Sequence, residues 1–120
     1  MAWIKIKCSS DITIGDVLAH DSTSNIYTKA NNMNAPLYVA MNDAQEDSEN
    51  LGTYLVKGKA QGQIEAKCSR NILDEGGFVA IENGAVYIDN SNTASPAIIW
   101  NNFINAQPRA AGDLVTITLR

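Results

Sequence analysis

Short alternations of apolar and polar residues recur along the chain. In the N-terminal stretch AWIKIKC, Ile4 and Ile6 fall on one face, and Trp3, Lys5 and Lys7 fall on the other. A period of two is typical of a β-strand with one buried face. Similar stretches, bounded by glycine, proline or asparagine, predict further strands at residues 16–20, 26–28, 36–41, 52–57, 63–68, 77–82, 85–89, 97–102 and 113–119. Asn83-Gly84 between two of them is typical of a two-residue hairpin turn.

No stretch carries the pattern of a helix of three turns. About ten short strands in 120 residues predict an all-β fold, a compact barrel or sandwich.

The two halves of the chain repeat one another. KCSSDI at residues 7–12 returns as KCSRNI at residues 67–72, and each copy holds one of the two cysteines. GDVLA at residues 15–19 matches GGFVA at residues 76–80, and Gly52 matches Gly112. Solenoids need three or more repeats, so two copies favour halves that close on each other about a pseudo-twofold axis. We therefore predict a single domain, 1–120, built from a first half at 1–60 and a second at 61–120.

Composition narrows the class of partner. The chain has 13 acidic and 9 basic residues and a formal net charge of −4, which argues against binding to phosphate backbones. No apolar run approaches the roughly 20 residues of a membrane span. The start, MAWIKIKCSS, lacks the basic and then apolar regions of a signal peptide, so we expect no secretion.

The residues that usually carry catalysis or bind metals are few. There is one histidine, His20, at the end of a predicted strand, where a surface role is favoured over catalysis. Cys8 and Cys68 share strand faces with isoleucines and are expected to be reduced, small core residues. Nucleotide-binding glycine motifs are absent from the sequence. We expect no enzymatic activity, no cofactor and no structural metal.

The halves differ most after their fourth strand. Residues 43–49 carry four carboxylates, whereas the matching residues 103–109 have lost them and begin with Phe103. The acidic stretch lacks the central glycine and the spacing of an EF-hand. It reads as a solvated loop, and whether it binds a cation stays open. Ala40 of the first half is replaced by Trp100 in the second.

Three segments carry a family resemblance: GDVLAHD at residues 15–21, APLYVA at 35–40 and GTYLVKG at 52–58. In this order, with the acidic stretch before the last, they resemble the small β-rich capsid decoration, or cement, proteins of tailed bacteriophages. The resemblance implies a structural virion protein without an active site, made in the host cytoplasm. Such a protein binds the capsid exterior, commonly as a homotrimer, and bridges neighbouring major capsid protein subunits.

Positions at which the halves disagree predict the docking surface, because only one copy needs to face a partner. Aromatic residues and arginine are enriched at binding hot spots, so we expect Trp100, Phe103 and Arg109 to lie near a protein–protein contact, with Trp3 as a further candidate. The alternative is a non-enzymatic ligand-binding β module, for instance for carbohydrate, in which Trp3 or Trp100 is a stacking platform.

Overall fold

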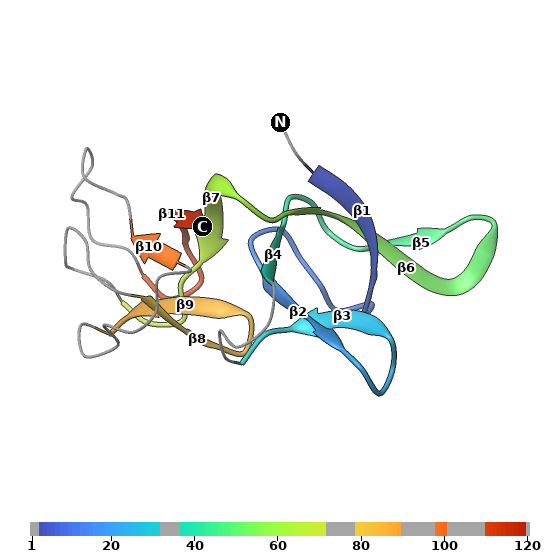
Figure 1. Ribbon diagram of the computed structural model, residues 1–120, viewed down its shortest axis with the longest axis horizontal. Helices are drawn as coiled ribbons and strands as arrows, with labels where there is room; N and C mark the ends of the chain where they lie inside the picture. The colour runs from blue at the N-terminus through green and yellow to red at the C-terminus, as the bar shows by residue number, and fades with distance from the viewer. Residues whose placement is uncertain (1–2, 32–36, 72–78, 90–97, 101–109, 120) are drawn as a thin grey trace.

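Five strands of the first half close into a small barrel (Figure 1). The computed structural model describes residues 3–31, 37–71, 79–89, 98–100 and 110–119. The barrel strands are β1 (Trp3–Cys8), β2 (Val17–Asp21), β3 (Ile26–Lys29), β4 (Leu37–Ala40) and β6 (Asn50–Lys59). Their order is β1-β3-β2-β4-β6, and β6 closes the ring by pairing with β1. Only the β1–β3 pair is parallel among these neighbours.

The described strands of the second half form two smaller sheets. They are β7 (Gly62–Lys67), β8 (Val79–Glu82), β9 (Ala85–Ile88), β10 (Ile98–Trp100) and β11 (Leu114–Leu119). β11 lies between β10 and β7, and β8 pairs with β9. A parallel bridge between Cys68 and Val86 connects the end of β7 to β9. The molecule is elongated, 44 × 26 × 25 Å, with the two halves side by side along its length (Figure 1).

Contacts at the two cysteines match between the halves. Cys8 pairs in parallel with Tyr27, and Cys68 pairs in parallel with Val86. The N–H of the serine that follows each cysteine donates to the carbonyl of that partner, at 3.0 Å in the first half and 2.9 Å in the second. The repeated KCS phrase therefore occupies the same place in both halves.

The last strands of the two halves correspond at a spacing of 59 residues, whereas the sequence predicted a spacing of 60. Ile6 lies opposite Val56, and Ala66 lies opposite Val115. Val115 is thus the counterpart of Val56, 59 residues away, whereas Ala66 follows Ile6 by 60. The predicted match of Gly52 with Gly112 would place Thr116 over Val56; the strand registers instead place Val115 there, and Val56 and Val115 are both buried. Superposition of the complete halves involves residues outside the described ranges, so the full duplication stays a prediction.

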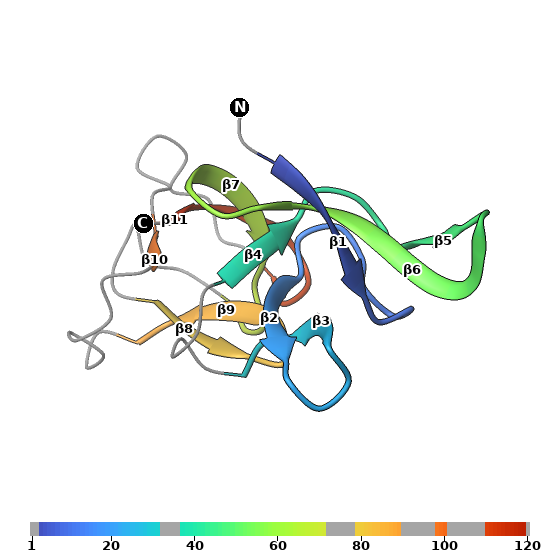
Figure 2. The same ribbon diagram turned by 45° about the vertical axis from the view of Figure 1, so that its right-hand side comes forward.

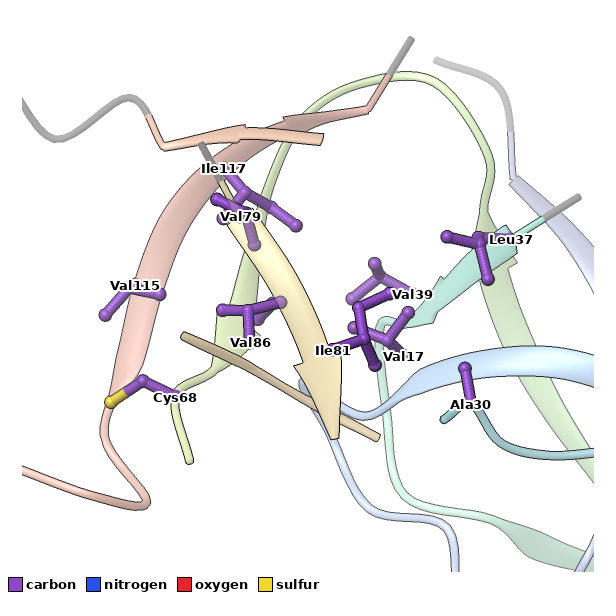
Figure 3. Close-up of a cluster of buried hydrophobic side chains, with 11 residues drawn as sticks. Val17, Ala30, Leu37, Val39, Cys68, Val79, Ile81, Val86, Val115 and Ile117 are labelled. Atoms are coloured by element: carbon purple, nitrogen blue, oxygen red, sulfur yellow. The ribbon is translucent and has the colours of Figure 1, made fainter. Parts of the chain in front are cut away.

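Two hydrophobic clusters fill the interior. The first-half core belongs to one half alone and consists of Ile6, Cys8, Ile12, Leu18, Ala40 and Val56. The shared core draws on both halves (Figure 3) and consists of Val17, Ala30, Leu37, Val39, Ala66, Cys68, Val79, Ile81, Val86, Val115 and Ile117. Adjacent residues on β2, Val17 and Leu18, point into different clusters, since side chains alternate along a strand. β2 therefore connects the two cores.

The hairpin turn at Asn83-Gly84 forms as predicted and also joins the halves. Both residues have positive φ, 47° and 77°, as the turn requires. The Gly84 N–H donates to the carbonyl of Ala30 at 2.7 Å, and the Gly84 carbonyl accepts from the N–H of Val17 at 2.8 Å. The tip of the β8–β9 hairpin is thus hydrogen-bonded to the first half through both the N–H and the carbonyl of Gly84.

The acidic stretch is a hairpin rather than the solvated loop we predicted. β5 (Gln45–Asp47) pairs antiparallel with β6, which extends from Asn50 and so begins before the predicted strand. The hairpin projects from the barrel as an arm (Figures 1 and 2). Leu51 near its tip is 82% exposed. The correction has a simple cause: pairing with the long edge of β6 supplies backbone hydrogen bonds that the acidic sequence does not signal.

The expectation of an all-β fold with a barrel is confirmed. Eleven strands and no helix are found in the residues that the structure describes. No helix long and apolar enough to cross a membrane occurs among them. Ile4 departs from its predicted burial: it is 47% exposed, because it lies beyond the packed interior near the end of β1.

Candidate functional site

The outward side of β1 and β6 carries the most distinctive surface of the described residues. Lys5 and Lys7 alternate on β1 with the buried Ile6 and Cys8, and Trp3 lies on the same side of the strand as the lysines. The antiparallel register then places Lys57 directly opposite Lys5, and Lys59 directly opposite Trp3. We call this set of five side chains the basic face. It holds four of the six lysines of the chain.

Trp3 lies on the basic face next to a lysine. Its relative exposure is 42%, and the Nζ atom of Lys57 lies 4.6 Å from the centroid of its ring. A cation over an aromatic face is attracted by the ring quadrupole, by about 0.5–1 kcal/mol at exposed sites. The contact places the Lys57 charge beside the Trp3 ring at the surface. The predicted interface residue Trp3 is therefore exposed and lies next to a cation.

Carboxylates of the arm border the basic face. A shallow groove of about 230 Å³ is lined by Lys5, Asn42, Gln45, Glu46, Asp47, Ser48, Leu55, Val56 and Lys57. The pKa of Asp47 is lowered, first by the N–H of Glu49 and the amide of Asn50, and then by the charges of Lys5 and Lys7. Positive and negative side chains thus meet along one edge of the face. The groove is smaller than the roughly 300–1,000 Å³ of typical small-molecule pockets.

Three carboxylates of residues 43–49 accept hydrogen bonds from backbone N–H groups. Asp47 accepts from Glu49 at 3.0 Å, and Glu46 accepts from Gly52 at 3.0 Å. Asp43 accepts from the N–H of Ile14 at 2.9 Å. Across the described chain, no group of three or more His, Cys, Asp or Glu side chains gathers as metal ligands would. The carboxylates stabilise the hairpin and its junction with the barrel.

Most of the other predicted interface residues lie outside the residues that the structure describes. Phe103 and Arg109 lie outside the described residues. The backbone of Trp100 belongs to β10 and pairs with Ile117 of β11. Its first-half counterpart, Ala40, pairs with Gly58 of β6. The structure therefore describes the backbone of Trp100 as part of a strand, as the sequence predicted.

His20 and the cysteines occupy the kinds of position predicted for them. His20 is exposed on β2, with its Nε2 atom 2.9 Å from the Asn25 side-chain oxygen and its ring edge-on to Tyr27. Cys8 and Cys68 are free and buried. Burial, and to a smaller extent Asp11, raises the pKa of Cys8 to about 11. These thiols are held in the neutral form, which is a poor nucleophile.

Sequence reasoning named Trp3 alone as a candidate interface residue: it placed Lys5 and Lys7 on the same strand face without a role, and it missed Lys57 and Lys59. The alternation of GTYLVKGK puts both lysines on one side of a strand, which was a readable signal. Their placement beside Lys5 and Trp3 required the β1–β6 register, which links residues about 50 positions apart along the chain.

Comparisons of the chain with protein-family models, with curated proteins and with solved structures find no match.

Proposed function

We propose that this chain is a structural virion protein that binds the outer surface of a phage capsid and bridges major capsid protein subunits. The observation that carries the proposal is the basic face: an exposed tryptophan and four lysines on the rigid wall of a closed barrel. Tryptophan is enriched at the centres of protein interfaces, and charged residues at their rims steer association. The resemblance of three segments to capsid decoration proteins supports the same role.

The proposal assigns no catalytic residue to the chain. In the described residues, the one histidine is exposed beside an asparagine, and both thiols are buried with raised pKa values. The contact surfaces proposed are the basic face with Trp3, and the divergent segment with Trp100, Phe103 and Arg109. A homo-oligomer, such as a trimer, would present several copies of these surfaces to neighbouring capsid subunits.

Co-sedimentation with capsids tests the proposal. The purified chain is mixed with shells of the phage whose genome carries its gene, and the pellet is assayed for the chain. We expect saturable binding, additional density on the shell exterior in negative-stain images, and greater resistance of the shells to heat. A genome without capsid genes, or shells that neither bind the chain nor gain stability from it, would contradict the proposal.

A second candidate, a carbohydrate-binding module, is favoured by the exposure of Trp3. Sugar rings stack on exposed aromatic side chains, and Trp3 lies beside a shallow groove rich in amide and charged groups. Glycan-array binding, with loss of signal in Trp3→Ala, would favour this candidate over the virion protein.

A further inference from the structure

The lysines of the basic face have no salt-bridge partner among the described residues. Salt bridges in that part of the chain join Lys29 to Asp11, Lys67 to Asp16 and Arg70 to Glu82. Lys57 instead lies over Trp3, and the ammonium of Lys59 donates to the carbonyl of Gln63 at 2.8 Å. The positive charge of the face is therefore only partly offset by its own molecule.

Two of these lysines repel one another. Lys5 and Lys57 are directly opposite on neighbouring antiparallel strands, and like charges in that position destabilise a sheet. An anion seated between the two ammonium groups would convert this repulsion into attraction. The unfavourable pair is thus a feature that a negatively charged partner would relieve.

The corresponding face of the second half has a different character. By the registers of the two strand pairs, Lys5 corresponds to Glu65 and Lys57 corresponds to Thr116. Both second-half residues lie on strands of the same order and pairing, β7 and β11. An antiparallel strand pair of this kind therefore does not require lysine at these positions. Among the described residues, the β7–β11 pair lacks the facing lysines that the β1–β6 pair carries.

The border of the face indicates what kind of anion fits. Glu46 and Asp47 line the same groove as Lys5 and Lys57. A phosphate backbone crossing the face would meet these carboxylates, and the net charge of −4 disfavours a long polyanion further. A folded protein can instead present carboxylates to the lysines and neutral or basic groups to the acids. Such mosaic complementarity is how charged protein interfaces fix their register.

From this arrangement we infer that the basic face is the docking site for a carboxylate-bearing surface of another protein, with Lys5 and Lys57 as the principal contacts at its centre and Trp3 at one end. The inference deepens the proposed function, on which it rests only for the identity of the partner as the capsid. The acidic groups of the partner lie against β1 and β6, and the arm flanks the contact.

An NMR titration tests the docking face directly. The ¹⁵N-labelled chain is titrated at low salt with a synthetic peptide of alternating glutamate and serine, and separately with oligothymidylate of equal charge. We expect the peptide to shift the indole N–H of Trp3 and the amides of β1 and β6, and we expect high salt to suppress the shifts. Peptide shifts that are absent or lie elsewhere, or a face shifted by oligothymidylate alone, would overturn the inference.

Matched variants separate charge at this face from net charge. Lys5→Gln with Lys57→Gln should weaken peptide binding about tenfold, equivalent to about 1.4 kcal/mol. Lys5→Arg with Lys57→Arg should retain binding. Ala110→Glu with Ala111→Glu changes the net charge by the same amount at exposed residues of the second half and should also retain binding. Equal weakening by the two charge-changing pairs would show a nonspecific effect and overturn the inference.

Capsid co-sedimentation of the same variants distinguishes the two proposals. If the parent chain binds shells and the glutamine pair binds equally well, the docking face is wrong while the proposed function stands. If the parent chain does not bind shells, the proposed function fails, and the peptide titration still decides whether the face recognises carboxylates.

Discussion

Lys67 at the end of β7 places its Nζ atom 3.2 Å from the Oδ1 atom of Asp16, which joins the two halves by a charge pair. Asp16 is buried, and its other oxygen accepts the N–H of Thr13 at 2.8 Å. The Lys67 ammonium also donates to the hydroxyl of Thr13, and the Lys67 N–H donates to the carbonyl of Gly15 at 2.9 Å. A short segment before β2 is thereby fastened to the second half.

Removing the lysine should destabilise the protein substantially. Lys67→Met leaves the buried Asp16 carboxylate without its cation, and we expect a loss of about 2–3 kcal/mol, below the usual 3–5 because Lys67 is partly solvated. Urea unfolding measures the loss. Lys29→Met, which breaks the more exposed pair with Asp11 at 3.8 Å, is the control and should cost at most about 1 kcal/mol. Equal losses in the two variants would contradict the assignment.

Gly84→Ala should be far more costly than Gly52→Ala. Both glycines have positive φ, 77° and 87°, so each substitution adds backbone strain of about 1 kcal/mol. A Cβ at Gly84 would also lie 2.9 Å from the Lys29 side chain, whereas nothing lies within 4 Å of one at Gly52. We expect Gly84→Ala to cost about 1–2 kcal/mol more, since overpacking adds that much. Thermal unfolding of both variants provides the comparison.

The two thiols should be unreactive in the native protein and replaceable. Cys8→Ala and Cys68→Ala should each cost about 1 kcal/mol, as for a small core truncation. A thiol reagent should label neither cysteine quickly at neutral pH, and should label both after denaturation without reductant. Rapid labelling of both native thiols, or no labelling after denaturation, would contradict the reduced and buried state.

Cys8 should also contribute a pH dependence. Its folded pKa of about 11 lies above the ordinary thiol pKa of 9.0, so the unfolded chain loses the thiol proton first as the pH rises. The stabilising contribution of the Cys8 thiol is therefore complete below pH 9 and is lost as the pH rises towards 11. The free energy of unfolding of the parent, minus that of Cys8→Ala, should decline across this window. A difference that stays constant would show that the thiol ionises equally in both states.

The divergent segment of the second half gives a further test of docking. Phe103→Ala with Arg109→Ala should leave the unfolding free energy unchanged within about 0.5 kcal/mol, because the sequence predicts a loop there and surface substitutions usually cost no more. Capsid occupancy or self-association should fall at least tenfold, about 1.4 kcal/mol. If the double variant binds and associates like the parent chain, this segment is not a docking surface.

Short alternations of apolar and polar residues were enough to predict the barrel strands, because each strand turns one face towards a hydrophobic core. Ile6 and Cys8 are buried and Lys5 and Lys7 are exposed, as a period of two requires. β5 could not be predicted in the same way. Gln45, Glu46 and Asp47 bury no apolar face, and the strand exists because β6 offers an edge for pairing.

The candidate site could be predicted only in part from the sequence. Trp3 and its neighbouring lysines follow from local alternation, whereas the basic face as a whole depends on the β1–β6 register. The Asp16–Lys67 pair joins residues 51 positions apart, and nothing in the local sequence of either residue indicates the other. Long-range pairing of this kind is set by the packing of the halves, which a single sequence does not reveal.

The unequal division of the two cores has a consequence for how the chain is made. The first-half core is complete once β6 has left the ribosome, so the first barrel has the interior it needs before the second half is synthesised. The shared core requires Val17, Ala30, Leu37 and Val39 in addition to second-half residues. We therefore expect the first half to act as a folding template, with newly made β7 to β11 acquiring their interior by condensing onto a surface that is already in place.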